Sequence, residues 1–255
     1  MAKPVVLFLL AMIFTHRLLG AEPQPYIISG FDDVLRQAEN TSLVKAAFKI
    51  LEDDKGFSGM PQLYQAISNQ EVFPQFVLVS AISNWFDSRI DRFLTTSHYP
   101  SNRRYLRNWL TEWSIESFKI EKIRLILNQK IDRKFIIIFD NSEASLKLAA
   151  EIQGQFSKNA VAIYLRQVQN KKIPAEAMGF YTAFDIALNE FKHGRLSTEN
   201  VLKIGQTILN EQDINAIIPT YASCPVNDSS CTSDLSTMKD FCLKVRQHIG
   251  SLCKR

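Results

Sequence analysis

Carboxylates follow two apolar segments of this chain. Residues 26–31 lead into Asp32 and Asp33, and residues 134–139 lead into Asp140. The carboxyl ends of parallel strands meet at one edge of a sheet, where α/β enzymes place their reactive groups. There one carboxylate can attack phosphorus, a second can act as general acid and base, and others can hold magnesium. These residue types and positions predict a site for phosphoryl chemistry.

A hydroxyl group and a lysine complete this set. Thr95 and Thr96 end a short strand predicted over residues 91–96, and Lys119 lies in a helix predicted over residues 118–127. Hydroxyl and ammonium groups donate hydrogen bonds to phosphate oxygens, so these three residues are candidate phosphate-binding residues. The structural alternatives are that strand-end aspartates cap a loop and that the lysine is solvated.

Strands and helices alternate from residue 22 to about residue 215. This order predicts a doubly wound α/β fold with a parallel sheet covered on both faces. The predicted strands cover residues 26–31, 76–81, 91–96, 134–139 and 160–165. The predicted helices cover residues 43–51, 60–68, 102–113, 118–127, 144–156, 180–191 and 198–209. Trp109 and Trp113 share one face of the helix predicted over residues 102–113, which indicates core packing.

The composition favours some classes of partner over others. The chain has 255 residues, 46% hydrophobic and 22% charged, enough for one large core or for one core plus a small appendage. The formal net charge is only +4 and like charges form no long block, so we expect no nucleic-acid partner. A mildly basic surface suits phosphorylated or anionic-lipid ligands.

Residues 1–21 have the pattern of a secretory signal peptide. A positive start at Lys3 precedes the apolar residues 4–14, and cleavage is predicted after Ala21. The apolar run is shorter than the roughly 20 residues that span a membrane. An uncleaved anchor is the alternative. We therefore predict a secreted or periplasmic, in any case extracytoplasmic, protein.

All four cysteines lie near the C-terminus of the chain. An even number of clustered cysteines in an exported chain favours disulfides, and three pairings are open. A four-thiolate zinc site is the alternative, but zinc ligands usually come in pairs about two to four residues apart. We predict an α/β domain over residues 22–218 and a small, disulfide-stapled, cysteine-rich extension over residues 219–255. The disulfide candidates are Cys224, Cys231, Cys242 and Cys253.

Five segments, in order along the chain, carry a family resemblance. They are residues 59–64, 93–97, 118–127, 133–142 and 160–166. They match the patterns Gly-Met-Pro-x-Leu-Tyr, Leu-Ser-Asn-Ser, a lysine-bearing helix, Arg-x-Phe-x-Leu-x-Gly-Asp-Ser and Val-x-Ala-Ile-Tyr-Ile-Arg. Over about residues 26–192, the chain resembles the catalytic domain of the actin-patch-associated phosphatidate phosphatases. That family lies in the haloacid dehalogenase (HAD-like) superfamily, which implies a Rossmann-type sheet.

The first motif departs from the family pattern. That pattern, Ser-Asp-Ile-Asp-Asp-Thr, aligns with residues 29–34, so Gly30 stands at the position of the attacking aspartate. Glycine has no side chain and cannot form a phosphoaspartate. The resemblance therefore implies a site whose nucleophile is lost, while Asp32 keeps the general acid/base position.

The resemblance also assigns the remaining roles. It implies that Thr95 and Lys119 act with Asp32 in catalysis, and that Asp32 and Asp140 hold Mg²⁺. The second carboxylate of the fourth motif falls at Ser145, so the set of metal ligands is incomplete. The implied reaction is magnesium-dependent hydrolysis of a lipid phosphomonoester.

Two hypotheses of function follow. In the first, the chain is an active phosphatase that uses another attacking group, such as a water molecule activated by Asp32. In the second, it is a pseudoenzyme that binds a phosphorylated ligand or a protein partner, since loss of a nucleophile can erase most of the rate enhancement. The expected ligand is a phosphorylated lipid or another phosphomonoester, with peripheral membrane contact.

Overall fold

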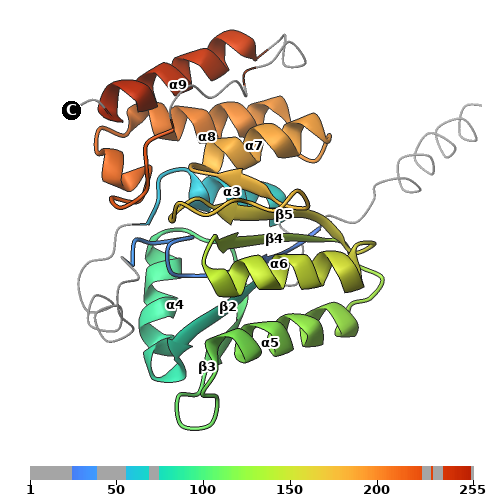
Figure 1. The fold of residues 1–255 in the computed structure, drawn as a ribbon. Coiled ribbons are helices and arrows are strands. Elements are labelled where there is room, and N and C mark those ends of the chain that lie inside the picture. Colours follow the sequence, from blue (N-terminus) through green and yellow to red (C-terminus); the bar gives the residue numbers. More distant parts are fainter. Residues whose placement is uncertain (1–24, 39–55, 69–74, 226–230, 232–237, 254–255) are drawn as a thin grey trace, which may run out of the picture.

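A six-stranded parallel sheet forms the centre of the molecule (Figure 1). The computed structural model describes residues 25–38, 56–68, 75–225, 231 and 238–253. Neighbouring strands follow the order β3-β2-β1-β4-β5-β6, and every pairing is parallel. The predicted α/β fold is confirmed. The strands are β1 (Tyr26–Ser29), β2 (Phe76–Ser83), β3 (Asn102–Arg107), β4 (Phe135–Asp140), β5 (Ala160–Arg166) and β6 (Met178–Phe180).

Apolar side chains of the strands alternate between two packed layers, one on each face of the sheet. Ile27 and Ile136 enter one layer, whereas Ile28 and Ile137 enter the other. Because both faces are covered, a central strand must be apolar on both sides, and all of β4 is buried. This burial explains the unbroken apolar run in that part of the sequence.

Helices cover both faces of the sheet (Figure 1). Apolar residues of α5 and α6 pack in one layer, and those of α3, α4, α7 and α8 pack in the other. The predicted helix over residues 43–51 lies outside the described residues, and the helix predicted over residues 180–191 begins later because β6 precedes it. The helices are α3 (Met60–Ser68), α4 (Asp87–Thr96), α5 (Ile115–Gln129), α6 (Glu143–Phe156), α7 (Ala183–Lys192), α8 (Thr198–Asn210) and α9 (Lys239–Cys253).

The strand predicted over residues 91–96 is wrong, because this segment is the second half of α4. The helix buries Ile90, Phe93 and Leu94, which recur at helical spacing. Residues 91–96 without Ile90 contain only the adjacent apolar pair Phe93 and Leu94, so they do not show the three-to-four-residue spacing of a helix.

The helix predicted over residues 102–113 is also wrong, because its first half is the strand β3. β3 lies at the edge of the sheet, so it lacks the apolar run of the central strands and carries Arg103 and Arg104. Trp109 and Trp113 follow in the loop before α5 rather than on a buried helical face. Trp113 is 84% exposed, so core packing is the wrong interpretation of this residue.

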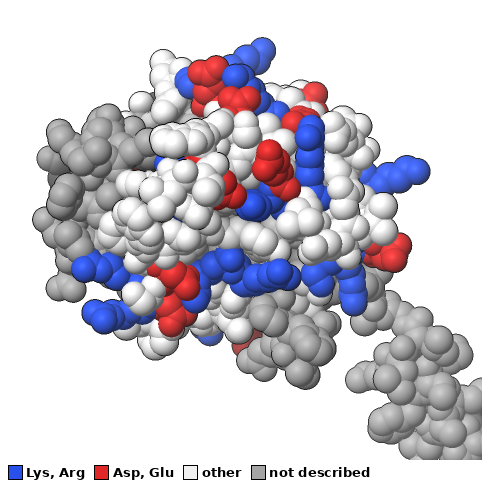
Figure 2. Space-filling view, turned by 90° about the horizontal axis from the view of Figure 1, so that it is seen from below, with Lys and Arg blue, Asp and Glu red and all other residues white. Residues whose placement is uncertain are grey.

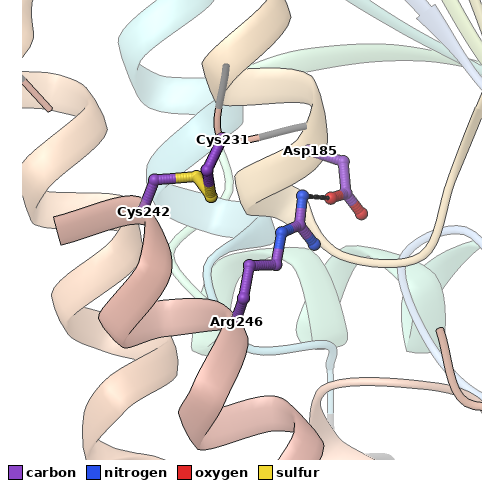
Figure 3. Close-up of a disulfide and its surroundings, with 4 residues drawn as sticks. All are labelled: Asp185, Cys231, Cys242 and Arg246. Carbon is purple, nitrogen blue, oxygen red and sulfur yellow. Dashed lines mark hydrogen bonds and ion pairs between the residues drawn. A yellow bond between two sulfur atoms is a disulfide. The ribbon is translucent and has the colours of Figure 1, made fainter. Parts of the chain in front are cut away.

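The C-terminal extension is closed on itself by two disulfides, and apolar packing and an ion pair hold it against the sheet domain. Cys224 pairs with Cys253, and Cys231 pairs with Cys242, which leaves no thiolate for the zinc alternative. Figure 3 shows the second disulfide near the start of α9, where Arg246 also forms an ion pair with Asp185 of α7. Buried residues of α9 join the same apolar layer as α7 and α8. The domain boundary at residue 219 stays a prediction.

The two disulfides favour an oxidising, extracytoplasmic location. The predicted leader over residues 1–21 lies outside the described residues. Within the described part of the chain, no helix is long and apolar enough to cross a membrane.

Candidate functional site

A cavity of about 730 Å³ opens at the carboxyl edge of the sheet. It lies where the strand order reverses. From β1 the chain adds β2 and β3 on one side of the sheet, and then adds β4, β5 and β6 on the other side of β1. Such switch points are where open α/β sheets bind their ligands. Polar or charged side chains of the lining come from β2, from the ends of the other central strands and β3, and from α5 and α6. They include Asp32, Asp33, Ser80, Arg107, Glu116, Lys119, Asp140 and Glu143.

Asp32 lies at this cavity but is tied to a buried arginine. The Arg36 guanidinium donates to Asp32 Oδ1 at 2.7 Å, and Arg36 is fully buried. Burial raises the pKa of Asp32, and the charges of Arg36 and Lys119 offset this only in part. Asp32 can therefore retain a proton more readily than an ordinary aspartate, but one of its two oxygens already serves Arg36.

Asp140 ends β4 and is held as a carboxylate. Its Oδ1 accepts hydrogen bonds from Ser142 N at 3.0 Å, Ser142 Oγ at 2.5 Å and Ser145 Oγ at 2.7 Å. Burial opposes ionisation, but Lys119 and these hydrogen bonds outweigh it, so the pKa of Asp140 lies below its usual value. Ser145 thus supports Asp140 at the position where the family pattern offers a second carboxylate.

Lys119 projects into the cavity from the first half of α5. It is only 9% exposed, so the alternative of a solvated helical lysine is wrong. Its charge acts on both Asp32 and Asp140, and its Nζ lies 5.4 Å from the centre of the Phe139 ring. The structure therefore brings together three of the predicted residues, Asp32, Lys119 and Asp140.

Phe139 occupies the space beside Gly30. A Cβ atom added to Gly30 would lie 3.0 Å from Phe139 Cδ1 and 3.3 Å from Val34 Cγ2. Real Cβ atoms rarely come so close to another side chain. Phe139 stands where the family pattern Arg-x-Phe-x-Leu-x-Gly-Asp-Ser has glycine. The missing side chain at Gly30 and the added ring at Phe139 therefore complement each other across two neighbouring strands.

Thr95 and Thr96 do not join the site. Both lie on the exposed side of α4, and neither lines the cavity. Thr96 Oγ1 instead donates to the carbonyl of Arg92 in its own helix at 2.9 Å. The prediction that they bind phosphate depended on a strand over residues 91–96, and it has no support once that segment is a helix.

Ser80 and Arg107 are the lining residues that the sequence analysis missed. Ser80 is a buried hydroxyl near the end of β2, and it directly follows a run of four apolar residues, just as Asp140 follows one. Arg107 is the last residue of β3, and its guanidinium lies 5.5 Å from the Trp109 ring centre. Among the described residues, its buried Nε has no hydrogen-bond partner. The apolar run before Ser80 could have predicted its position at the end of a buried strand segment. Arg107 follows no such run, because the edge strand β3 is largely polar.

The residues present do not fit a magnesium centre. Mg²⁺ takes six oxygen ligands and is usually anchored by carboxylates. Among the described residues, no three His, Cys, Asp or Glu side chains gather closely enough to hold a metal ion. Asp32 is paired with Arg36, and Asp140 Oδ1 accepts three hydrogen bonds. The further positions that the family pattern would use are Gly30 and Ser145.

Asp33 is buried beside the cavity and is sensitive to pH. Its Oδ1 accepts hydrogen bonds from Ala38 N at 2.8 Å and from the Tyr221 hydroxyl. Burial nevertheless raises the pKa of Asp33 from 3.8 to about 6. The folded protein therefore binds this proton more tightly than the unfolded chain. The resulting stabilisation is complete below about pH 4 and is lost as the pH rises to about 6.

We expect Asp33→Asn to remove this pH dependence. Relative to the wild type, the variant should gain about 2 to 3 kcal/mol in free energy of unfolding between pH 4 and pH 7. Urea unfolding at a series of pH values measures the difference. Asp132→Asn, at an exposed position on the opposite edge of the sheet, is the control. Parallel curves for wild type and Asp33→Asn would contradict the assignment.

One family model matches the chain, and it covers most of this site. The family is described as "Phosphatidate phosphatase APP1, catalytic domain", and the match spans residues 26–167. This range runs from β1 through β5 and includes Gly30, Lys119 and Asp140. No curated protein and no solved structure matches the chain.

Proposed function

The chain belongs to the family of phosphatidate phosphatase APP1 catalytic domains, and from this membership we propose that it binds a phosphorylated lipid headgroup without hydrolysing it. The ligand enters the cavity at the carboxyl edge of the sheet. The family is one of metal-dependent phosphatases, whereas binding to this chain does not depend on magnesium. The protein is exported, with residues 1–21 as its leader.

The contact between Gly30 and Phe139 carries this proposal. An aspartate at position 30 would need the space that the Phe139 ring occupies. The chain therefore lacks the attacking carboxylate, and a side chain at position 30 would require the Phe139 ring to shift by a few tenths of an ångström. In enzymes whose catalytic residues act as a unit, removal of the nucleophile can cost about 10⁶-fold in rate.

The cations of the cavity support binding of a phosphate group. Lys119 and Arg107 both line it, and Ser80 offers a hydroxyl at the same edge. Charge-assisted hydrogen bonds from Lys and Arg to phosphate are among the stronger polar contacts in proteins. A phosphate group would also give the buried Arg107 Nε an acceptor.

Phosphate release separates the two hypotheses of function. We expect wild-type protein with magnesium to release no more phosphate from phosphatidate, or from a simple phosphomonoester, than Asp32→Ala does. Magnesium-dependent turnover that Asp32→Ala abolishes would overturn the proposal in favour of an active enzyme. Gly30→Asp alone is not a sufficient test of lost catalysis, because Phe139 obstructs the new side chain.

Direct binding tests the cavity itself. We expect a soluble short-chain phosphatidate to bind, and Lys119→Met to weaken binding about 10- to 100-fold, since a buried charged hydrogen bond is lost. Affinity is measured by titration with and without a magnesium chelator, and it should not change with the chelator. Lys158→Met, at an exposed site on the opposite edge, is the matched control. Equal affinities for the two variants would rule out this cavity as the binding site.

A further inference from the structure

All three tryptophans of the chain lie after strand ends at the carboxyl edge of the sheet, and two of them line the cavity. Trp109 and Trp113 line it, and Trp85 belongs to the segment that follows β2. Trp109 Nε1 donates to the carbonyl of Ala81 at 3.1 Å, which ties the loop after β3 to the end of β2. The remaining aromatic residues of the described chain are mostly in the core.

Two of these tryptophans face solvent together with a leucine. Trp113 is 84% exposed, and Trp85 and Leu110 are each 67% exposed. We call Trp85, Leu110 and Trp113 the tryptophan patch. Its two segments face one another, because Asn84 lines the same surface hollow as Thr111. Large apolar side chains exposed side by side usually mark a binding surface.

The charges around the patch suit an anionic surface. The acidic groups beside it are engaged by cations, since Arg104 pairs with both Asp87 at 2.6 Å and Asp91 at 2.7 Å, and Lys122 pairs with Glu112 at 2.9 Å. Arg89, one helical turn beyond Trp85, is exposed and has no partner among the described residues. The loop between β3 and α5 projects downward in Figure 1. Figure 2, seen from below, shows a row of Lys and Arg side chains across this end, with Asp and Glu side chains beside them.

We propose that the tryptophan patch docks on an anionic lipid bilayer and sets the mouth of the cavity against the lipid headgroups. Indole rings favour the boundary between headgroups and acyl chains, because one end of the ring is apolar and the other donates a hydrogen bond. Trp113 and Lys119 line the same cavity, so one headgroup could pass from the rim to the buried cation. The choice of a lipid partner over a protein rests on the proposed function.

Binding of this kind should be weak, reversible and sensitive to salt. A few interfacial side chains anchor a protein stably only when basic residues add electrostatic attraction to anionic lipid. We expect the double variant Trp113→Ala/Leu110→Ala to lower the partition coefficient of the protein between water and anionic vesicles at least tenfold. Arg89→Ala should lower it about fivefold, and only on anionic vesicles.

Sedimentation with vesicles tests the proposal. The vesicles are phosphatidylcholine alone, or phosphatidylcholine mixed with phosphatidylserine or with phosphatidate. Ile131→Ala is the matched control, because Ile131 is 62% exposed in the loop before β4, at the other edge of the sheet. Equal losses in the patch variant and the control, or no binding to any anionic vesicle, would overturn the proposal. So would self-association that the patch variant abolishes without lipid.

Intrinsic fluorescence supplies a second readout that needs no label. Because the tryptophans all lie at this end, docking should shift the emission to shorter wavelength, and brominated lipids should quench it. Unchanged emission on sedimenting vesicles would contradict docking through this patch. Docking to phosphatidylserine without binding of soluble short-chain phosphatidate would refute the proposed function alone. Binding of the soluble lipid without vesicle docking would refute this inference alone.

Discussion

Gly30→Asp should lower the free energy of unfolding by about 3 kcal/mol. The new Cβ would lie 3.0 Å from the Phe139 ring, and overpacking of a buried site typically costs about 1 to 3 kcal/mol. The carboxylate adds a desolvation cost, which the nearby Lys119 offsets only in part. Urea unfolding measures the change. Gly154→Asp is the control, because nothing lies within 4 Å of a Cβ at that helical position.

A double-mutant cycle with Phe139→Gly isolates the cause. Phe139→Gly alone should cost about 3 to 5 kcal/mol through the cavity that it leaves. If the ring fills the space of the absent aspartate, the double variant should be more stable than the sum of the single losses predicts, by at least about 1 kcal/mol. Additive losses would show that the two positions do not share this space.

Loss of the disulfide between Cys224 and Cys253 should have an effect of similar size. This bridge closes a longer loop, with a sequence separation of 29 against 11 for Cys231 and Cys242. Under the chain-entropy account, removal should cost about 3.5 kcal/mol for the longer loop and about 3 kcal/mol for the shorter one. Each pair is replaced by alanine, and chemical unfolding is compared with that of the oxidised wild type. Unchanged stability of either variant would contradict a structural role for that bridge.

The apolar runs of the sequence were sufficient to predict the centre of the fold. β1 and β4 are fully buried, β2 is buried except for one residue, and the second half of β5 is buried, so these strands carry apolar runs that lead into the polar site. The edge strand β3 is mostly half-buried, and its mixed composition resembled a helix. Residues 91–96 alone do not show the helical period of α4, because Ile90 lies just before them.

The candidate site was predictable where a residue directly follows a central strand or keeps a family motif. Asp32, Asp140 and Lys119 were found in this way, and Thr95 was misplaced because its motif was assigned to the wrong element. The contact between Gly30 and Phe139 joins neighbouring strands that are far apart in the sequence. A contact between residues so far apart in the sequence leaves no local pattern. Only the structure shows that the Phe139 ring lies beside Gly30, where a side chain is absent.

That contact has a consequence for the history of the chain. A single substitution that introduces an aspartate at position 30 meets the Phe139 ring, and a single substitution that removes the ring leaves a cavity, so we expect either step alone to weaken the fold. The free energy of unfolding of a typical domain is only about 5 to 15 kcal/mol. Either single variant would therefore lose a large fraction of its stability. One-residue exchanges at positions 30 and 139 therefore pass through a less stable protein in either direction, so we expect the two residues to change together.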